Sequence, residues 1–385
     1  MPTDGYRTLR HAGETIAMQD VVVTPEEINA EPEDGATSVI SRSAGGSISG
    51  LLSYSTYDDF IAAVMGIDWV DEKSFRVTDE KRFPTLRLKG DKVELEFHEE
   101  TPILLKWPSA GTVRIQNLEG SEVEVPYRII NSDRLEDWRD IITFSRDDGI
   151  KILNSIQRDD LFARDTVDLK IQKIQLGAIV NSNLSKSFTI RKKINSSYQI
   201  FSGNIVSKIK FDFQTQQTPS IQIDFIGAKM NIDEVSKYKG PTPATTTQIM
   251  QASSFQNFRL GDSSYDWLVQ SAKLTLTRNG ATLEQGIGSV YPSGVQFGSF
   301  SVTLDLEIYL RSDNPVDLFF SGGSGPVSFT IFDEQERRYE VRLLNAKFHN
   351  ASAPIDQKNK SMILHVAVTG NPFLGGGTLA IRRVG

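Results

Sequence analysis

The chain has 385 residues, with 42 lysines and arginines against 49 aspartates and glutamates, and a formal net charge of −7. Its length favours two or three domains, and its 39% share of hydrophobic residues is ordinary for packed domains. The absence of cysteine excludes disulfides, thiolate metal sites and cysteine nucleophiles. An acidic chain whose longest basic cluster is the three residues 191–193 argues against a nucleic-acid-binding protein.

Membrane and export signals are also missing. No apolar run approaches the roughly 20 residues that span a bilayer. Residues 1–20 carry charges throughout, where a signal peptide would have its apolar core. We therefore expect no membrane partner, and a protein made and kept in a cytoplasm unless it leaves as part of an assembly.

The N-terminal region predicts two strands. Residues 20–24 are rich in valine, and residues 47–54 alternate between apolar and polar side chains, which is the strand period. Gly45 and Gly46 are expected to break the chain before the second strand.

A short helix is predicted next. Ser55 or Thr56 can cap its start, and Asp58 and Asp59 suit its positive end. The apolar residues of 60–65 then fall on one face, and Gly66 is expected to end the helix.

Residues 69–178 are expected to form a domain of their own. Short alternating segments follow one another there, separated by glycine-containing turn signals. This spacing is typical of a small β-sandwich or barrel. The predicted strands are residues 85–88, 93–97, 112–115 and 123–125.

Longer strands fill residues 188–230, and residues 231–256 follow without periodicity. So long an irregular stretch is usually functional or disordered. The glycine-rich end, 373–385, is expected to be a flexible arm.

An internal repeat organises these elements. Each of three landmarks recurs 141 residues later: Ser187 at Ser328, where both open a Ser-Phe-Thr-Ile segment, Tyr198 at Tyr339, and Ser220 at Ser361. Repeats decide the fold, so this one takes precedence over local patterns. It needs no gap between the landmarks. It predicts a first β-unit from residues 1–68 and 179–230, the insert 69–178, a loop 231–256, a second β-unit 257–372 and the arm 373–385.

Upstream, a strand followed by a short helix also recurs. The segment containing Tyr54 and the helix after it matches the segment containing Tyr309 and a helix within residues 313–320. The strand at 20–24 has a counterpart at 273–277. Two copies of a β-unit in one chain suggest a subunit that builds something by pseudo-symmetry.

The sequence contains no recognisable catalytic or metal-binding pattern. None of the four histidines has a partner at metal-ligand spacing, and no acidic calcium loop is present. The glycine-rich stretches lack both the dinucleotide fingerprint and the lysine of a phosphate loop. We therefore predict no enzyme, no cofactor and no metal.

Residues 53–69 resemble the signature of tail tube proteins of long, non-contractile bacteriophage tails, a strand followed by Tyr-Asp-Asp-Phe, a short apolar helix and a tryptophan. Residues 187–206 and 267–285 resemble later strands of the same family. The resemblance implies a mainly β (α+β) fold: two fused copies of a tail-tube β-sandwich or barrel unit with flanking short helices, plus the inserted small β-domain. Two sheets would join around a central channel.

The same resemblance implies a structural virion protein that assembles into stacked rings, the conduit for DNA ejection. Its partners would be further copies of itself, three to a ring with pseudo-six-fold symmetry, the tape measure protein and other tail proteins. DNA would pass without specific binding. The protein would lie in the virion tail, and in the host cytoplasm during assembly. Two alternatives stay open, a related tail ring such as a terminator or baseplate-hub component, and a carbohydrate-binding adhesin.

Two groups of residues are the candidate sites. Carboxylates that alternate with apolar residues on long strands are candidates for the channel lining: Asp224, Asp305 and Glu307. The apolar and aromatic residues of the long loop and its end are candidates for contacts between rings: Tyr238, Ile249, Met250 and Phe255.

Overall fold

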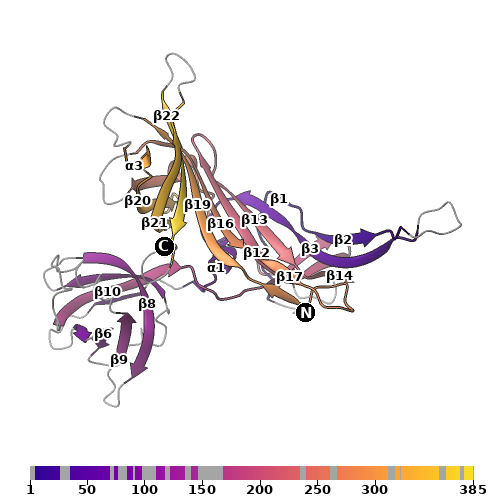
Figure 1. Cartoon of the computed structure of the whole chain (residues 1–385), viewed down its shortest axis with the longest axis horizontal. Coiled ribbons are helices and arrows are strands. Elements are labelled where there is room, and N and C mark those ends of the chain that lie inside the picture. Colours follow the sequence, from indigo (N-terminus) through magenta and orange to yellow (C-terminus); the bar gives the residue numbers. More distant parts are fainter. Residues whose placement is uncertain are drawn as a thin grey trace. The chain divides into compact units, whose positions relative to one another are not determined.

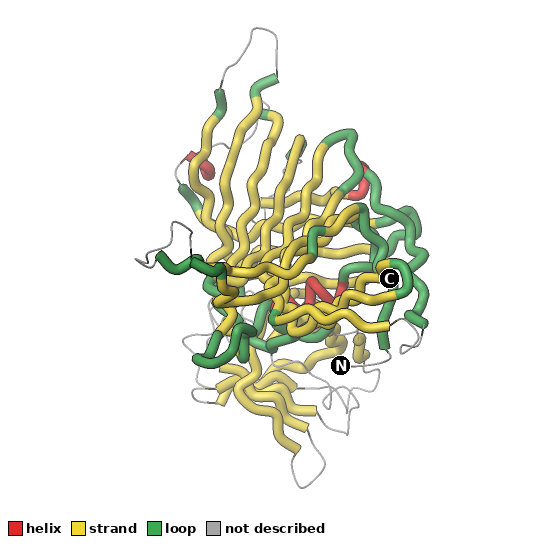
Figure 2. Tube along the Cα trace, turned by 90° about the vertical axis from the view of Figure 1, so that its right-hand side faces the viewer, coloured by secondary structure: helices red, strands yellow, loops and turns green. Residues whose placement is uncertain are grey.

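A computed structural model of the chain describes residues 5–26, 35–69, 73–76, 85–89, 92–97, 110–117, 122–134, 140–145, 168–234, 240–260, 267–310, 317–320, 322–354, 361–372 and 377–384. They form two compact units (Figure 1). Unit 1 comprises Met1–Gly66, Asn183–Ser254 and Val269–Ile308, and unit 2 comprises Ile67–Ser182, Phe255–Leu268 and Tyr309–Gly385. Antiparallel strands dominate and helices are short (Figure 2), which confirms the mainly β, tube-type fold.

Unit 1 is built around one antiparallel sheet in the order β3, β13, β12, β16, β19. The edge strand β3 also pairs with β1 and β2, and the N-terminal half of β12 pairs with β11 and β14. Its elements are β1 (Gly13–Glu14), β2 (Ala17–Val23), β3 (Ser38–Leu51), α1 (Asp58–Met65), β11 (Phe188–Ile194), β12 (Ser197–Gln214), β13 (Ser220–Gly227), β14 (Lys229–Glu234), the 3-10 helix η5 (Ala252–Ser254), β16 (Val269–Asn279), β17 (Thr282–Glu284), β18 (Gly294–Gln296) and β19 (Ser299–Tyr309).

Strand β3 runs through the glycines that were expected to break it. Gly46 has a φ of +143°, and a Cβ there would lie 2.5 Å from the Thr15 carbonyl oxygen. The glycine therefore lets the chain near β1 approach β3, instead of ending the strand. A two-residue glycine signal does not distinguish a break from a close approach of backbones.

Helix α1 ends as predicted and begins differently. Gly66 adopts the left-handed conformation, with φ 66°, that closes many helices. The N-cap is Tyr57, without a side-chain cap. The Thr56 hydroxyl is instead bonded to the hydroxyls of Ser53 (2.6 Å) and Thr245 (2.5 Å), a partner that lies too far along the chain for a local pattern to reveal.

In unit 2, the strands of the predicted insert close on themselves. Strand β10 pairs with β7, β7 with β8, β8 with β9, β9 with β6, β6 with β5, and β5 with the start of β10. This closed order is that of a small antiparallel barrel, which removes open edges among these strands. The elements here are β4 (Lys73–Arg76), β5 (Thr85–Lys89), β6 (Lys92–Phe97), β7 (Ala110–Asn117), β8 (Glu122–Arg134), β9 (Asp140–Ser145) and β10 (Asp168–Val180).

The remainder of unit 2 is a second antiparallel sheet. Strand β20 lies between β15 and β21, and β21 pairs along its length with β22 and β23. An aromatic cluster holds helix α3, with Phe319 packed edge-on against Trp267 and Phe348 at 5.3 Å between ring centroids. The elements are β15 (Phe255–Leu260), α3 (Asp317–Phe320), β20 (Ser324–Phe332), β21 (Arg338–Ser352), β22 (Ile363–Asn371) and β23 (Leu379–Val384).

Most of the described C-terminal segment is a buried strand and not the expected flexible arm. Strand β23 pairs with β21 on one edge and with Ala178–Val180 of β10 on the other. Leu379, Ile381 and Arg382 are at most 2% exposed. The glycines before this strand dominated the sequence pattern, whereas its burial depends on two strands far away in sequence.

The 141-residue repeat is visible in strand pairing, but not without a gap. The first six residues of β12 pair with β14, and the first six of β21, which lie 141 residues later, pair with β23 in the same way. The hairpin before them differs, because two residues separate Ile194 from Ser197 and five separate Phe332 from Arg338. The two Ser-Phe-Thr-Ile segments are thus three residues out of step, and the gap-free alignment is wrong at this landmark.

Candidate functional surface

The central sheet of unit 1 has one apolar and one polar face. Alternate residues of β13, β16 and β19 are buried, as the two-residue period of a strand requires, and the register aligns them in rows with residues of β3 and β12. One such row, with each member at most 5% exposed, is Ile48, Ile223, Ile209, Leu276 and Val302. The adjacent row on the opposite face is Ser47, Asp224, Lys208, Thr277 and Ser301.

Helix α1 contacts β12 and β16, and its Phe60 ring packs edge-on against Phe225 at 5.4 Å. The buried Arg278 side chain fixes the end of the helix by donating from Nε to the Val64 carbonyl oxygen at 2.7 Å. Its guanidinium lies 4.4 Å from the Phe297 ring centroid, and burial lowers the pKa of Arg278 to about 10. The apolar side of unit 1 is therefore packed, which leaves the polar face as the candidate functional surface.

The polar face pairs acids with bases. Lys208 lies opposite Asp224, and Lys273 lies between Asp212 and Asp305 in neighbouring strands. Opposite charges at such cross-strand positions contribute about 0.2–1 kcal/mol each. Each of the predicted carboxylates Asp224 and Asp305 therefore has a lysine directly opposite it in the neighbouring strand.

Hydrogen bonds within this face orient two of the predicted carboxylates, Asp224 and Glu307. Gln222 Nε2 donates to Asp224 Oδ1 at 2.7 Å, and Ser271 Oγ donates to Glu307 Oε2 at 2.8 Å. Asp305 is exposed, and Asp224 and Glu307 are half-buried. The structure thus brings all three predicted channel-lining residues onto one face of one sheet.

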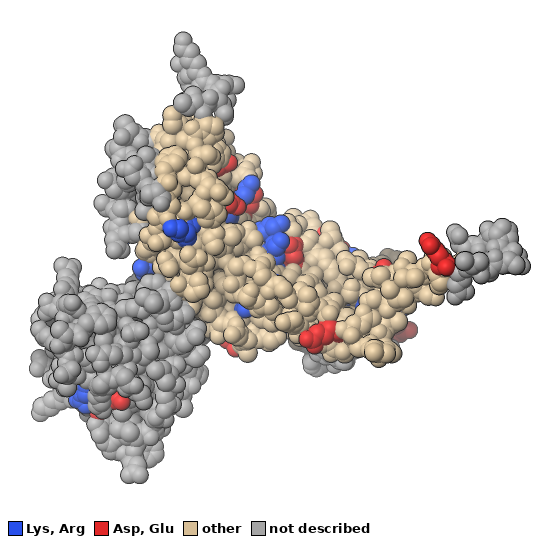
Figure 3. All heavy atoms as spheres, in the orientation of Figure 1, with Lys and Arg blue, Asp and Glu red and all other residues tan. Residues whose placement is uncertain are grey.

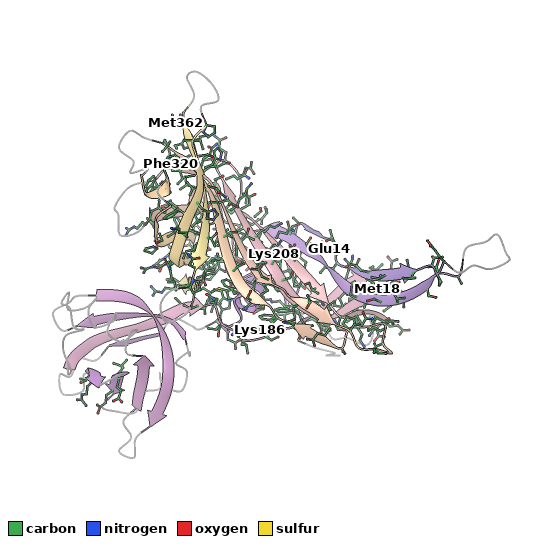
Figure 4. The ribbon with its side chains drawn as sticks, viewed as in Figure 1. Glu14, Met18, Lys186, Lys208, Phe320 and Met362 are labelled. Atoms are coloured by element: carbon green, nitrogen blue, oxygen red, sulfur yellow. The ribbon has the colours of Figure 1, made fainter. Side chains whose placement is uncertain are left out.

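The face as a whole is weakly acidic. Three lysines (Lys208, Lys210 and Lys273) stand against four carboxylates (Asp212, Asp224, Asp305 and Glu307), which leaves one net negative charge. Figure 3 shows blue and red atoms side by side on a largely uncharged surface, and Figure 4 labels Lys208 on β12. Sequence analysis did not identify the lysines as part of this surface, because alternation reveals the face of a residue only within its own strand.

The predicted inter-ring segment is more regular than expected. Residues 231–234 belong to β14, and Phe255 begins β15. Between them, Arg10 Nη1 donates to the carbonyl oxygens of Thr245 (3.1 Å) and Thr247 (2.7 Å). The main chain at Thr245 and Thr247 therefore has a hydrogen-bond partner in its own unit, which the irregular sequence pattern of this stretch did not predict.

The four inter-ring candidates lie in different environments. Met250 is fully buried in unit 1, and its N–H donates to the Leu52 carbonyl oxygen at 2.9 Å, whereas Ile249 is 42% exposed. Phe255, in unit 2, packs against Phe329 at 4.9 Å between ring centroids. Tyr238 lies outside the described residues. Of the three that are described, Ile249 has the side chain most available to another molecule.

Two other features, a metal site and a membrane-spanning helix, are absent from the described residues. No group of three or more histidines, cysteines or carboxylates is placed to hold a metal ion within the described ranges. In the same part of the chain, no helix has the length and apolar character needed to cross a bilayer.

A model of the phage tail tube protein family matches residues 7–370. The chain therefore belongs to this family, whose members are structural proteins of the phage tail and not a class of enzymes. No match was found among curated proteins.

Proposed function

We propose that this protein assembles into stacked rings that form the tail tube, and that the polar face of the unit 1 sheet lines the channel through which DNA is ejected. The observation that carries the proposal is the two-sided sheet. Its apolar face packs inside unit 1, and its other face presents polar side chains with nearly balanced charge. The family match supports an assembled tail protein.

A nearly balanced, weakly acidic wall suits a conduit. Protein affinity for DNA comes largely from lysines and arginines that neutralise phosphates. Here each of Lys208 and Lys273 has a carboxylate in the neighbouring strand, so few cations are left to hold DNA. A ring repeats the remaining negative charge in every copy, so DNA would be repelled weakly all around the channel.

Three chains per ring is the proposed stoichiometry. Two β-units per chain, related by the 141-residue repeat, would give a pseudo-six-fold channel from three chains. The matched pairing of β12 with β14 and of β21 with β23 supports the duplication. The partners are further copies of the chain, the tape measure protein and other tail proteins, in the virion tail and, during assembly, in the host cytoplasm.

The insert, proposed at residues 69–178, would lie on the outside of the tube. Its closed strand order needs no edge from the rest of unit 2, although the end of β10 also pairs with β23. Replacing residues 70–176 with a short Gly-Ser linker, which keeps Ala178–Val180, should leave tube formation intact. Tubes lost from a deletion variant that still folds would contradict an outer position.

Electron microscopy of the purified protein tests the proposal. We expect tubes of stacked rings with three chains and pseudo-six-fold symmetry, and a cryo-EM map should place Asp224, Asp305 and Glu307 on the inner wall. Rings that never stack would favour a terminator or baseplate-hub ring. A monomer that binds glycans would favour the adhesin, and either result would overturn the tube.

A further inference from the structure

The outer edge of β2 is open in unit 1. In the part of the chain that the structure describes, β2 pairs only with β3. Three consecutive valines on it are strongly exposed, Val21 at 54%, Val22 at 54% and Val23 at 43%. Figure 1 shows the β2–β3 ribbon, where β2 is labelled, extending away from the rest of unit 1. An isolated two-stranded ribbon is marginally stable, and an apolar strand edge invites pairing with another strand.

Strand β16 is the counterpart of β2 in the second repeat. Each precedes and pairs with a strand that leads toward a short helix: β2 pairs with β3 before α1, and β16 pairs with β19 before α3. Strand β16, however, has no open edge along Ser271–Thr277, because there it also pairs with Lys208–Gln214 of β12. Leu274 and Leu276 of β16 are accordingly buried.

Strand β21 is the counterpart of β12. The first six residues of β12 pair with β14, and the first six residues of β21 pair with β23. These two pairings align the strands with an offset of 141 residues. The segment of β21 that corresponds to Lys208–Gln214 therefore begins at His349. Pairing of β21 with β20 ends at Lys347, and along residues 349–352 the described chain supplies β22 on one edge and no strand on the other.

We propose that residues 20–23 of β2 in one chain pair, antiparallel, with residues 349–354 of a second copy of the chain. This rests on the proposed ring, and it repeats between chains the β12–β16 pairing that the chain makes within unit 1. Each copy carries one edge of each kind, so the contact is head-to-tail, and it gives a ring where the rotation from copy to copy closes. Main-chain hydrogen bonds would supply affinity, and the valines would be covered.

The proposal names the two segments that pair, and not the individual residues that lie opposite each other. A bulge interrupts β12 between Val206 and Lys208, whereas the bulge of β21 falls between His349 and Ser352, where Asn350 has a φ of 53°. A scan over neighbouring positions therefore tests the contact better than one chosen pair.

Disulfide trapping provides this scan, because the chain has no cysteine to compete. Ala351→Cys is combined in turn with Val21→Cys, Val22→Cys and Val23→Cys, and each protein is oxidised after assembly. Directly paired strands bring Cα atoms within the range of about 4.4–6.8 Å that a disulfide allows. We expect at least one combination to give covalent dimers and a closed trimer on denaturing gels. Each single variant, and Val22→Cys with Gln217→Cys in an exposed turn, should stay uncrosslinked.

A charge on the edge gives an independent measurement. Val22→Lys should abolish ring formation and leave the circular dichroism melt of the monomer unchanged, because this side chain is already half exposed. Ala17→Lys, on the same strand but outside the proposed pairing, should assemble like the unaltered protein. Assembly of Val22→Lys as efficient as that of Ala17→Lys would count against the pairing.

The outcomes separate this inference from the proposed function. Tubes from the unaltered protein and from all cysteine pairs, without any crosslink, would overturn the strand pairing and leave the tube standing. Crosslinked rings that never stack would support the pairing and overturn the tube.

Discussion

Strands β14 and β23 have the same pairing and opposite burial. Each pairs through six residues with the start of a long strand, β12 or β21. In β14, Ile232 is 65% exposed, whereas its counterpart in β23, Arg382, is 2% exposed, as is the neighbouring Ile381. The difference lies in the neighbours, since β23 has β10 on its second edge, and among the described residues β14 has no second strand. A repeat thus conserves ladder geometry while the surrounding chain decides what is core.

The largest expected effect on folding stability comes from placing a carboxylate in β23, with the same change in β14 for comparison. Ile381→Asp should destabilise unit 2 by about 4 kcal/mol or more, because an unpaired carboxylate would be buried. Ile232→Asp, the control at the exposed isoleucine of β14, should change stability by about 0.5 kcal/mol or less. Urea unfolding of the monomers measures both. Similar losses in the two variants would show that β14 is as buried in solution as β23.

Helices α1 and α3, which precede β12 and β21 in the chain, offer a second comparison. Helix α3 is held by an aromatic cluster around Phe319, which is 1% exposed. Phe319→Ala should cost about 3–5 kcal/mol through lost packing and a cavity. Phe320→Ala is the neighbouring control, since Phe320 is 57% exposed and should have little effect. An equal shift in thermal midpoint for both would contradict this role of the cluster.

Helix α1 depends on a polar anchor instead. Arg278→Met keeps the length and apolar contacts of the side chain but removes the donor to the Val64 carbonyl oxygen. The expected loss is about 1–3 kcal/mol, the cost of leaving a buried acceptor without its partner. Thermal melts compare it with Arg259→Met, an exposed arginine in unit 2. If Arg278→Met melts like the control, the hydrogen bond contributes nothing to α1.

The smallest effect on stability is expected on the polar face. Replacing Asp224, Asp305 and Glu307 with lysine should change folding stability by about 1 kcal/mol or less per site, as for other exposed pairs. Tubes should still form. The charge of the face would change by six units per chain, so ejection of DNA should slow or stop, and the effect should weaken at high salt. Ejection at the normal rate from such tails would show that this face does not line the channel.

Structural features that depend on a few neighbouring residues were predicted well from the sequence. The end of α1 at Gly66 follows from local helix chemistry, and the alternation around Asp224 and Asp305 placed both on the polar side of their strands. The N-terminus of α1 was predicted incorrectly because the Thr56 hydroxyl bonds Thr245 in a distant segment. Strand β23 was missed for a similar reason: its neighbours β10 and β21 are far away in sequence.

Alternation in the sequence alone predicted that this protein is mainly β, and the segments at residues 53–69, 187–206 and 267–285 carried the resemblance to the tail tube family. Two related β-units with an insert stay a prediction from the internal repeat. Both signals depend only on residue order. Tertiary structure decided the register, and with it the lysines opposite Asp224 and Asp305, the gap in the repeat and the burial of β23. The physical reason is that hydrogen-bonded strands meet through long-range pairing, and a shift of one residue exchanges the two faces of a strand.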